Sequence, residues 1–227
     1  MKRNIIFIFL TLVVLSAFGQ EKCGTVVYTD YLMQKYPNYK KERKKVNLQT
    51  EKWIKSNQNY NQKTIITIPV VVHVVWNTNA ENISDAQIFS QIDVLNKDYR
   101  RTNTDAINTP SVWQSIAADT EIDFCLATVD PNGNPSTGIT RTQTSQTSFS
   151  ISNSNMKSTS TGGIDPWNQD DYLNIWVCDL GGGLLGYATP PSSFNNPEDG
   201  VVIGYRYFGT TGTVQSPYHK GRTSTHE

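Results

Sequence analysis

This sequence has few cysteines, no excess of positive over negative charge, and few long apolar runs. Only three cysteines occur in 227 residues, an odd number, so at least one of them cannot join an internal disulfide. The formal net charge is zero, and no nucleic-acid partner is expected. Beyond the N-terminus no segment approaches the roughly 20 apolar residues of a transmembrane helix, which argues against a membrane anchor. The 37% hydrophobic and 18% charged content is typical of a folded globular protein.

The N-terminus has the pattern of a signal peptide over residues 1–19. Lys2 and Arg3 supply a positive start, and the stretch from Ile5 to Ala17 is almost entirely apolar. Ala17 and Gly19 then place small residues at the two positions that signal peptidase inspects. We therefore expect a secreted, extracellular protein whose mature chain begins near Gln20.

The zero net charge hides an asymmetry between two parts of the chain. Residues 21–64 carry ten Lys or Arg and four Asp or Glu (+6), whereas residues 65–227 carry eight and sixteen (−8). Opposite charge favours docking of one part on the other, so residues 20–64 are interpreted as a detachable, exposed pro-segment with one central helix. Its basic cluster, Lys40 to Lys45, is a place where a trypsin-like protease could cut. A basic solvated linker is the alternative on charge alone.

From Ile65 onward the pattern changes to that of an α/β domain. Thr67–Trp76 is a β-branched run typical of a strand buried on both faces. Ser84 has the character of a helix N-cap, and Ile88, Ile92 and Leu95 follow at helical spacing. This pairing of a strand with an amphipathic helix predicts one mixed α/β (α+β) domain over residues 65–227.

The remaining elements are predicted from composition. Strands are expected at residues 121–129 and 172–178, a short edge strand at 184–190, another strand at 200–205, and a helix beginning near His219. Residues 140–163 are dominated by Ser, Thr, Asn and Gln and are predicted to form a long polar surface stretch.

The three cysteines differ in their surroundings. Cys125 and Cys178 each end an apolar, strand-like run, and both are expected to be buried free thiols; a disulfide between them remains an alternative. Cys23 lies in a polar, basic segment before Gly24, where no core is expected to cover it.

The sequence ends on His226-Glu227, which alone would be an ordinary dipeptide. Its context is a buried strand, a backing helix, a strand, a Gly-Gly-Gly edge, a further strand and then a helix that begins His-Glu. That order is typical of the upper subdomain of metzincin-type zincins. In their motif H-E-x-x-H-x-x-G-x-x-H, the first two histidines lie one helical turn apart and reach one zinc ion.

The likeness extends over nearly all of the sequence from Ile65. Thr67–Trp76, Phe124-Cys125-Leu126-Ala127, Asn174-Ile175-Trp176-Val177-Cys178 with its Gly181-Gly182-Gly183 continuation, and Gly221-Arg222-Thr223 before His226 resemble the pappalysin family. The resemblance is to its bacterial cytophagalysin-, ulilysin- and mirolysin-like branch of secreted zinc endopeptidases. It implies a twisted, mostly parallel sheet with an antiparallel edge strand, a backing helix and the start of an active-site helix.

The resemblance also implies roles for individual residues. His226 matches the first zinc ligand, and Glu227 matches the general base for attack of zinc-activated water on the peptide bond. Cys23 matches the cysteine of the pro-segment that can ligate the zinc and keep the enzyme latent; a spare exposed cysteine is the alternative. The second and third histidines would lie four and ten positions after His226. The expectation is therefore a chain truncated within the motif, without the lower subdomain and inactive by itself.

Further expectations concern substrates and rival functions. The run Gly183, Leu184, Leu185, Gly186 and Tyr187 is predicted to bind the main chain of a protein or peptide substrate by β-augmentation. Calcium in a longer enzyme is a further expectation of the resemblance. His73 is expected to be packed or hydrogen-bonded, and His219 structural or at the surface. The alternative function is a non-catalytic secreted adhesin or glycan-binding module that uses the polar stretch 140–163.

Overall fold

A computed structural model describes residues 22–58 and 64–227 of the chain. The predicted signal peptide lies outside these residues. Six strands form one sheet in the order β2-β1-β4-β6-β5, and β3 pairs with the second half of β1. Every pairing is parallel except that of β5 with β6, so β5 is the antiparallel edge strand. The strands are β1 (Ile66–Trp76), β2 (Ile122–Leu126), β3 (Ile139–Gln143), β4 (Leu173–Cys178), β5 (Gly186–Ala188) and β6 (Val201–Gly204).

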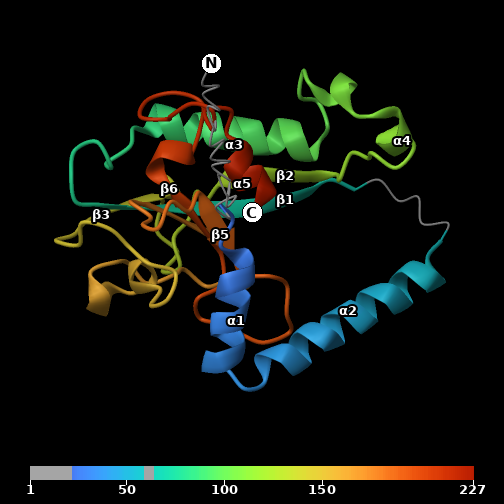
Figure 1. Ribbon diagram of the computed structural model, residues 1–227, viewed down its shortest axis with the longest axis horizontal. Coiled ribbons are helices and arrows are strands. Elements are labelled where there is room, and N and C mark those ends of the chain that lie inside the picture. Colours follow the sequence, from blue (N-terminus) through green and yellow to red (C-terminus); the bar gives the residue numbers. More distant parts are fainter. Residues whose placement is uncertain (1–21, 59–63) are drawn as a thin grey trace, which may run out of the picture.

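Helices cover both faces of this sheet (Figure 1). The α-helices are α1 (Thr25–Lys35), α2 (Tyr39–Ser56), α3 (Asp85–Tyr99), α4 (Ser111–Gln114) and α5 (Arg222–His226). Short 3-10 helices lie at η1 (Ala106–Asn108), η2 (Asn155–Lys157), η3 (Thr159–Thr161) and η4 (Tyr205–Tyr207). Within the described ranges, no helix combines the length and apolar character that a membrane crossing requires. The mixed α/β class predicted from the sequence is confirmed.

The alternation of side chains along β1 builds two cores. Val70, Val72 and Val74 join a core on the α3 side of the sheet, and Val75 joins a second core on the other side. The predicted helix is present as α3, and its N-cap is confirmed because the Ser84 hydroxyl accepts a hydrogen bond from the Gln87 amide at 3.2 Å.

Buried amide side chains of α3 hold the segment 205–221 in place. Gln87 Nε2 donates to the carbonyl groups of Tyr205 and Phe208 at 3.1 and 2.9 Å. Gln91 Nε2 donates to the Gly221 carbonyl at 3.0 Å, directly before α5. Both glutamines are fully buried. Since each bond satisfies a main-chain group that water cannot reach, α3 fixes where α5 begins.

The prediction of an exposed pro-segment with one central helix is wrong in two respects. Residues 22–58 form two helices, and Tyr28 and Leu32 of α1 are fully buried in the second core. Tyr39 is the buried residue of α2, which otherwise extends away from the sheet (Figure 1). Tyr28 and Leu32, at i and i+4 among the other apolar and aromatic residues of α1, were the sequence signal for this packed helix.

The interpretation of residues 140–163 as a polar surface stretch is also wrong in part. Its beginning is strand β3, and Phe149, Met156 and Lys157 are buried in or beside the second core. The stretch thereby forms a packed layer over one face of the sheet. These buried residues argue against a glycan-binding surface along the whole stretch.

All three cysteines are free. Cys178 is buried, as predicted, but Cys125 is exposed, so the expectation of a buried thiol was wrong there. β2 pairs only with the first half of β1, so it is an outer strand that turns Phe124 inward and Cys125 outward. Cys23 is half-buried, although the sequence indicated no core around it.

Candidate metal centre

Three potential metal ligands from the two ends of the described chain meet beneath the edge strand. Ligand atoms of Cys23, His226 and Glu227 all lie within 4.8 Å of one another. The Cys23 thiol donates a hydrogen bond to Glu227 Oε2 at 3.1 Å across 204 positions of sequence. Cys23 and Glu227 are half-buried, and His226 is exposed. Within residues 22–58 and 64–227 no second group of three such ligands is found, and nothing in the structure supports a calcium ion.

Main-chain pairing with β5 places Cys23 at this point. The Gly24 amide donates to the Gly186 carbonyl at 2.8 Å, and the Leu185 amide donates to the Lys22 carbonyl at 2.8 Å. Cys23 thereby forms a parallel bridge with Gly186. Residues 22–24 therefore occupy the free edge of β5 as one further short strand.

Thr25 ties the same segment to the carboxylate. Its hydroxyl donates to Glu227 Oε2 at 2.9 Å and accepts from the Ala188 amide at 2.9 Å. The Glu227 carboxylate thus accepts from both Cys23 and Thr25. Sequence reasoning missed Thr25, because nothing local to it indicates a contact 202 positions away.

The C-terminal end of α3 and the loop that follows it hold α5 on the side away from residues 22–25. The Thr225 hydroxyl donates to Asp98 Oδ2 at 2.7 Å. Arg222 forms ion pairs with Asp98 and Asp105 at 3.0 and 2.7 Å. Hydrogen bonds from Asn103 and then from Arg222 hold the pKa of Asp105 well below its usual range. These contacts fix the rotation of α5, and with it the direction of His226.

Burial raises the pKa of the Cys23 thiol. Hydrogen bonds from the main chain and hydroxyl of Thr25 lower this pKa, and the Glu227 carboxylate raises it further.

The cluster opens on a cavity of about 480 Å³. Lys22 and Cys23 of the N-terminal segment line it together with Leu185, Tyr218, His226 and Glu227. The Lys22 ammonium lies over the Tyr218 ring, 4.7 Å from its centroid. The N-terminal segment therefore forms one wall of the cavity that holds the potential ligands.

The five residues predicted to bind substrate lie in different environments. Gly183 and Leu184 lie in the turn before β5, and the main-chain groups of Leu185 and Gly186 pair with residues 22–24. Tyr187 is fully buried while the N-terminal segment is docked, and its ring lies 4.6 Å from that of Tyr28 in α1. Gly186 has a steric role: an added Cβ would meet Glu227 Cγ at 3.1 Å.

His73 is not part of the cluster, as predicted. It is fully buried in β1, with Nδ1 2.7 Å from Thr140 Oγ1 and Nε2 3.0 Å from Asn174 Oδ1. Burial lowers its pKa to about 4, which keeps the ring neutral.

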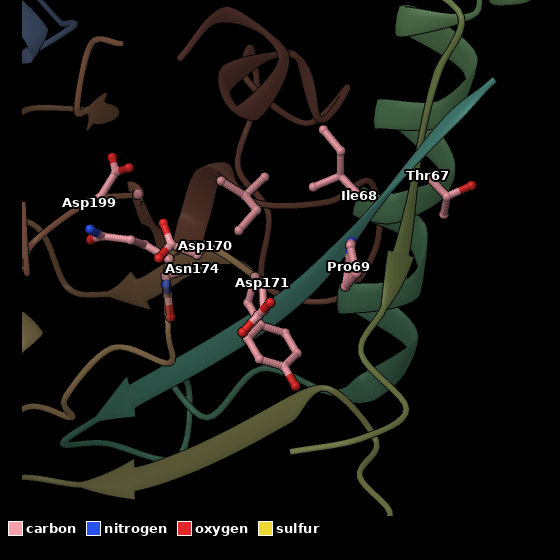
Figure 2. Close-up of a pocket in the computed structure, with 11 residues that line it drawn as sticks. Thr67, Ile68, Pro69, Asp170, Asp171, Asn174 and Asp199 are labelled. Atoms are coloured by element: carbon pink, nitrogen blue, oxygen red, sulfur yellow. The ribbon is translucent and has the colours of Figure 1, made fainter. Parts of the chain in front are cut away.

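A second cavity, of about 290 Å³, lies at the amino ends of β1 and β4. Figure 2 shows Thr67, Ile68 and Pro69 on one side of it and Asp170, Asp171 and Asp199 across from them. Burial raises the pKa of Asp199. This cavity shares no lining residue with that of the cluster.

A mostly parallel sheet, an antiparallel edge strand and a helix ending in His-Glu beneath that edge define the upper subdomain of a metzincin-like metalloprotease. Comparisons with protein-family models and with curated proteins found no match. Solved structures do match: mirolysin in complex with a compound at 56% identity, over 72% of this chain and 62% of that one, with a TM-score of 0.69. Mature mirolysin of Tannerella forsythia with a cleaved peptide matches at 53% identity over 74% and 62%, with a TM-score of 0.68.

A mutant of Tannerella forsythia promirolysin matches at 47% identity over 90% of this chain and 66% of that one, with a TM-score of 0.77. The chain thus spans less than two thirds of the length of these relatives, between 62% and 66%. At this level of identity the family is established. The chain belongs to the pappalysin family of metalloproteases, on the branch that contains mirolysin.

Proposed function

We propose that the protein is the zymogen form of a secreted zinc endopeptidase, in which residues 20–64 are the pro-segment and residues 65–227 the first part of the catalytic domain. The meeting of Cys23, His226 and Glu227 within 4.8 Å carries this proposal. The zymogen promirolysin matches 90% of this chain and mature mirolysin 74%, which supports a pro-segment at the N-terminal end.

The ligand set fits zinc. A thiolate, an imidazole and a carboxylate are the three side-chain types that zinc binds in proteins. Cys23 and His226 are the proposed ligands in the latent form. When bound, zinc would supply Lewis-acid polarisation of the peptide carbonyl and of water.

The chemistry of the chain's own residues rests on Glu227. A free carboxylate in this place can accept a proton from the attacking water and pass it on to the leaving amine. In the present arrangement the carboxylate accepts from Cys23 and Thr25 instead. Docking of residues 22–25 therefore occupies the proposed base as well as the proposed ligand position, which accounts for latency in two ways.

Substrate main chain is proposed to bind where residues 22–24 now lie. This segment pairs with the Leu185 amide, directly before β5, and with the Gly186 carbonyl of β5. Once the segment leaves, both become free to pair with an extended peptide, as in other cases of β-augmentation. The substrates proposed are proteins or peptides, and secretion follows from the predicted signal peptide.

Zinc binding by the 227-residue chain tests the ligand assignment. We expect zinc to bind the wild type, with affinity reduced at least about 10-fold in Cys23→Ala and in His226→Ala. Cys125→Ala is the matched control, because this thiol is exposed and outside the cluster. Equal zinc affinity in all four proteins would contradict the assignment.

Activity is tested by a second experiment. The chain carries one histidine of the three-histidine motif, so it is expected to show no peptidase activity with zinc. A polypeptide continued through histidines at the fourth and tenth positions after His226 is expected to become active when residues 20–64 are removed. In that longer protein Cys23→Ala should shorten the latent phase; unchanged latency would refute the role of Cys23.

A further inference from the structure

The N-terminal segment has a second attachment to the body of the protein, away from the cluster. Tyr28 of α1 is fully buried against Tyr187, and its hydroxyl lies between two polar partners. Lys157 Nζ donates to it at 3.0 Å, and it donates to Glu198 Oε2 at 3.3 Å. A phenol ring buried with its hydroxyl satisfied on both sides is the arrangement of a specific anchor.

Lys157 completes a preformed site for this ring. It is 3% exposed, donates to the Glu198 carbonyl at 2.7 Å, and lies over the rings of Tyr28, Trp176 and Tyr187 at 4.5, 5.0 and 5.2 Å from their centroids. Of these groups only Tyr28 belongs to the N-terminal segment. Trp176 and Tyr187 lie on the sheet, so the site for the phenol is built by the body itself.

The attachment continues along α1. Leu32, one turn after Tyr28, is fully buried in the same core. Lys35, in the last turn, forms an ion pair with Glu198 Oε1. Tyr39, the first residue of α2, is also fully buried, and its hydroxyl donates to the Pro190 carbonyl at 3.2 Å. Residues 22–39 thus contact the body at every turn.

The connection that follows is different. After Tyr39, helix α2 has no fully buried residue; it contacts the body where the Ser193 hydroxyl donates to Glu42 Oε2 at 2.5 Å, and its basic cluster is largely exposed. Within residues 22–39 the basic residues are Lys22 and Lys35, and both contact the body through Tyr218 and Glu198. A protease that selects Lys or Arg would therefore cut in α2, after segment 22–39.

We propose that the face formed by β5, Met156–Lys157 and residues 190–198 binds segment 22–39 non-covalently, with Tyr28 as anchor, so that a cut in α2 or after it leaves the segment in place. The inference rests on the proposed pro-segment but needs neither zinc nor catalysis. Loss of the pro-segment then takes two events: a cut in the connection and a later dissociation or cut within residues 22–39.

The test uses the full chain with a recognition sequence for a site-specific protease inserted between Asn57 and Gln58, at the end of α2. After the cut, size-exclusion chromatography with excess chelator should show the N-terminal piece co-eluting with the body, and denaturant should separate them. Tyr28→Ala is expected to weaken the complex about 100-fold or more. Tyr28→Phe, which keeps the ring, is expected to weaken it about 10-fold.

Val27→Ala is the matched control, because Val27 is 51% exposed on the same helix and should bind as the wild type does. Separation of the wild-type pieces in chelator would overturn the inference. If they stay together only when zinc is present, the link through Cys23 carries the docking: the proposed function then stands and this inference falls. If the Tyr28→Phe segment binds as tightly as the wild-type segment, the Tyr28 hydroxyl is not recognised, and the assignment of Tyr28 as the anchor is overturned.

Discussion

Gly186→Ala tests whether the edge strand and the proposed base share one tightly packed position. The new Cβ would lie 2.8 Å from the Val202 carbonyl oxygen and 2.7 Å from Ile203 Cδ1. The isoleucine methyl can turn away, but the carbonyl belongs to the neighbouring strand, so β5 and β6 must move apart. Overpacking of this kind costs about 1–3 kcal/mol. Alanine also has less conformational entropy than glycine in the unfolded chain, and this difference stabilises the folded state by about 0.4–1 kcal/mol.

The mid-range values leave a net loss of about 1 kcal/mol, which should lower Tm by about 2–4 °C in a chain of this size. The measurement is thermal unfolding followed by circular dichroism. Gly181→Ala is the matched control: it has no positive φ, and its Cβ would meet the Phe149 carbonyl oxygen at 3.4 Å, an ordinary contact. Hydrogen exchange at the Gly24 amide, which bonds to the Gly186 carbonyl, should also become faster. A variant at Gly186 that melts at or above wild type would refute the packing argument.

Two further predictions concern buried groups. Burial lowers the pKa of Lys157 to about 7, whereas an unfolded lysine keeps its proton to near 10.5. Above pH 7 the unfolded state therefore binds more protons, and the free energy of unfolding should rise with pH between these values. Lys157→Met removes this titrating group, so the Tm of wild type relative to Lys157→Met should rise between pH 6 and pH 9; a constant difference would contradict the shift. Among the thiols, Cys125 should react with a thiol reagent in the native protein and Cys178 only after unfolding, as labelling and mass spectrometry can show.

The strands and helix of the central domain could be predicted because their signals are local. β1 carries a continuous β-branched run, and α3 has apolar residues at helical spacing behind Ser84. Each of these signals lies within a few residues of the position it describes. His226 and Glu227, by contrast, were assigned through the resemblance of the upstream segments to the pappalysin family, because the dipeptide alone carries no motif spacing.

What the sequence did not show depends on contacts between distant segments. β3 has the polar sequence Ile139-Thr140-Arg141-Thr142-Gln143, and it is a strand because the second half of β1 offers it a partner. Helix α1 packs because Lys157 and Glu198, more than 120 positions away, accommodate Tyr28. The surroundings of Cys23 are set in the same way by β5. Local pattern cannot indicate such pairings, so the docked position of the N-terminal segment required the structure.

The hydrogen bonds from the side chains of Gln87 and Gln91 in α3 determine how the site responds to pH and salt. Gln87 and Gln91 hold segment 205–221 through hydrogen bonds between uncharged groups. Amides do not titrate, and dissolved salt screens them far less than it screens ion pairs. The starting point of α5 should therefore be the same in acidic and in saline surroundings, while the ion pairs of Arg222 respond to both. For a protein proposed to be secreted, the helix that carries His226 and Glu227 is therefore held at its start by contacts that respond little to pH and salt.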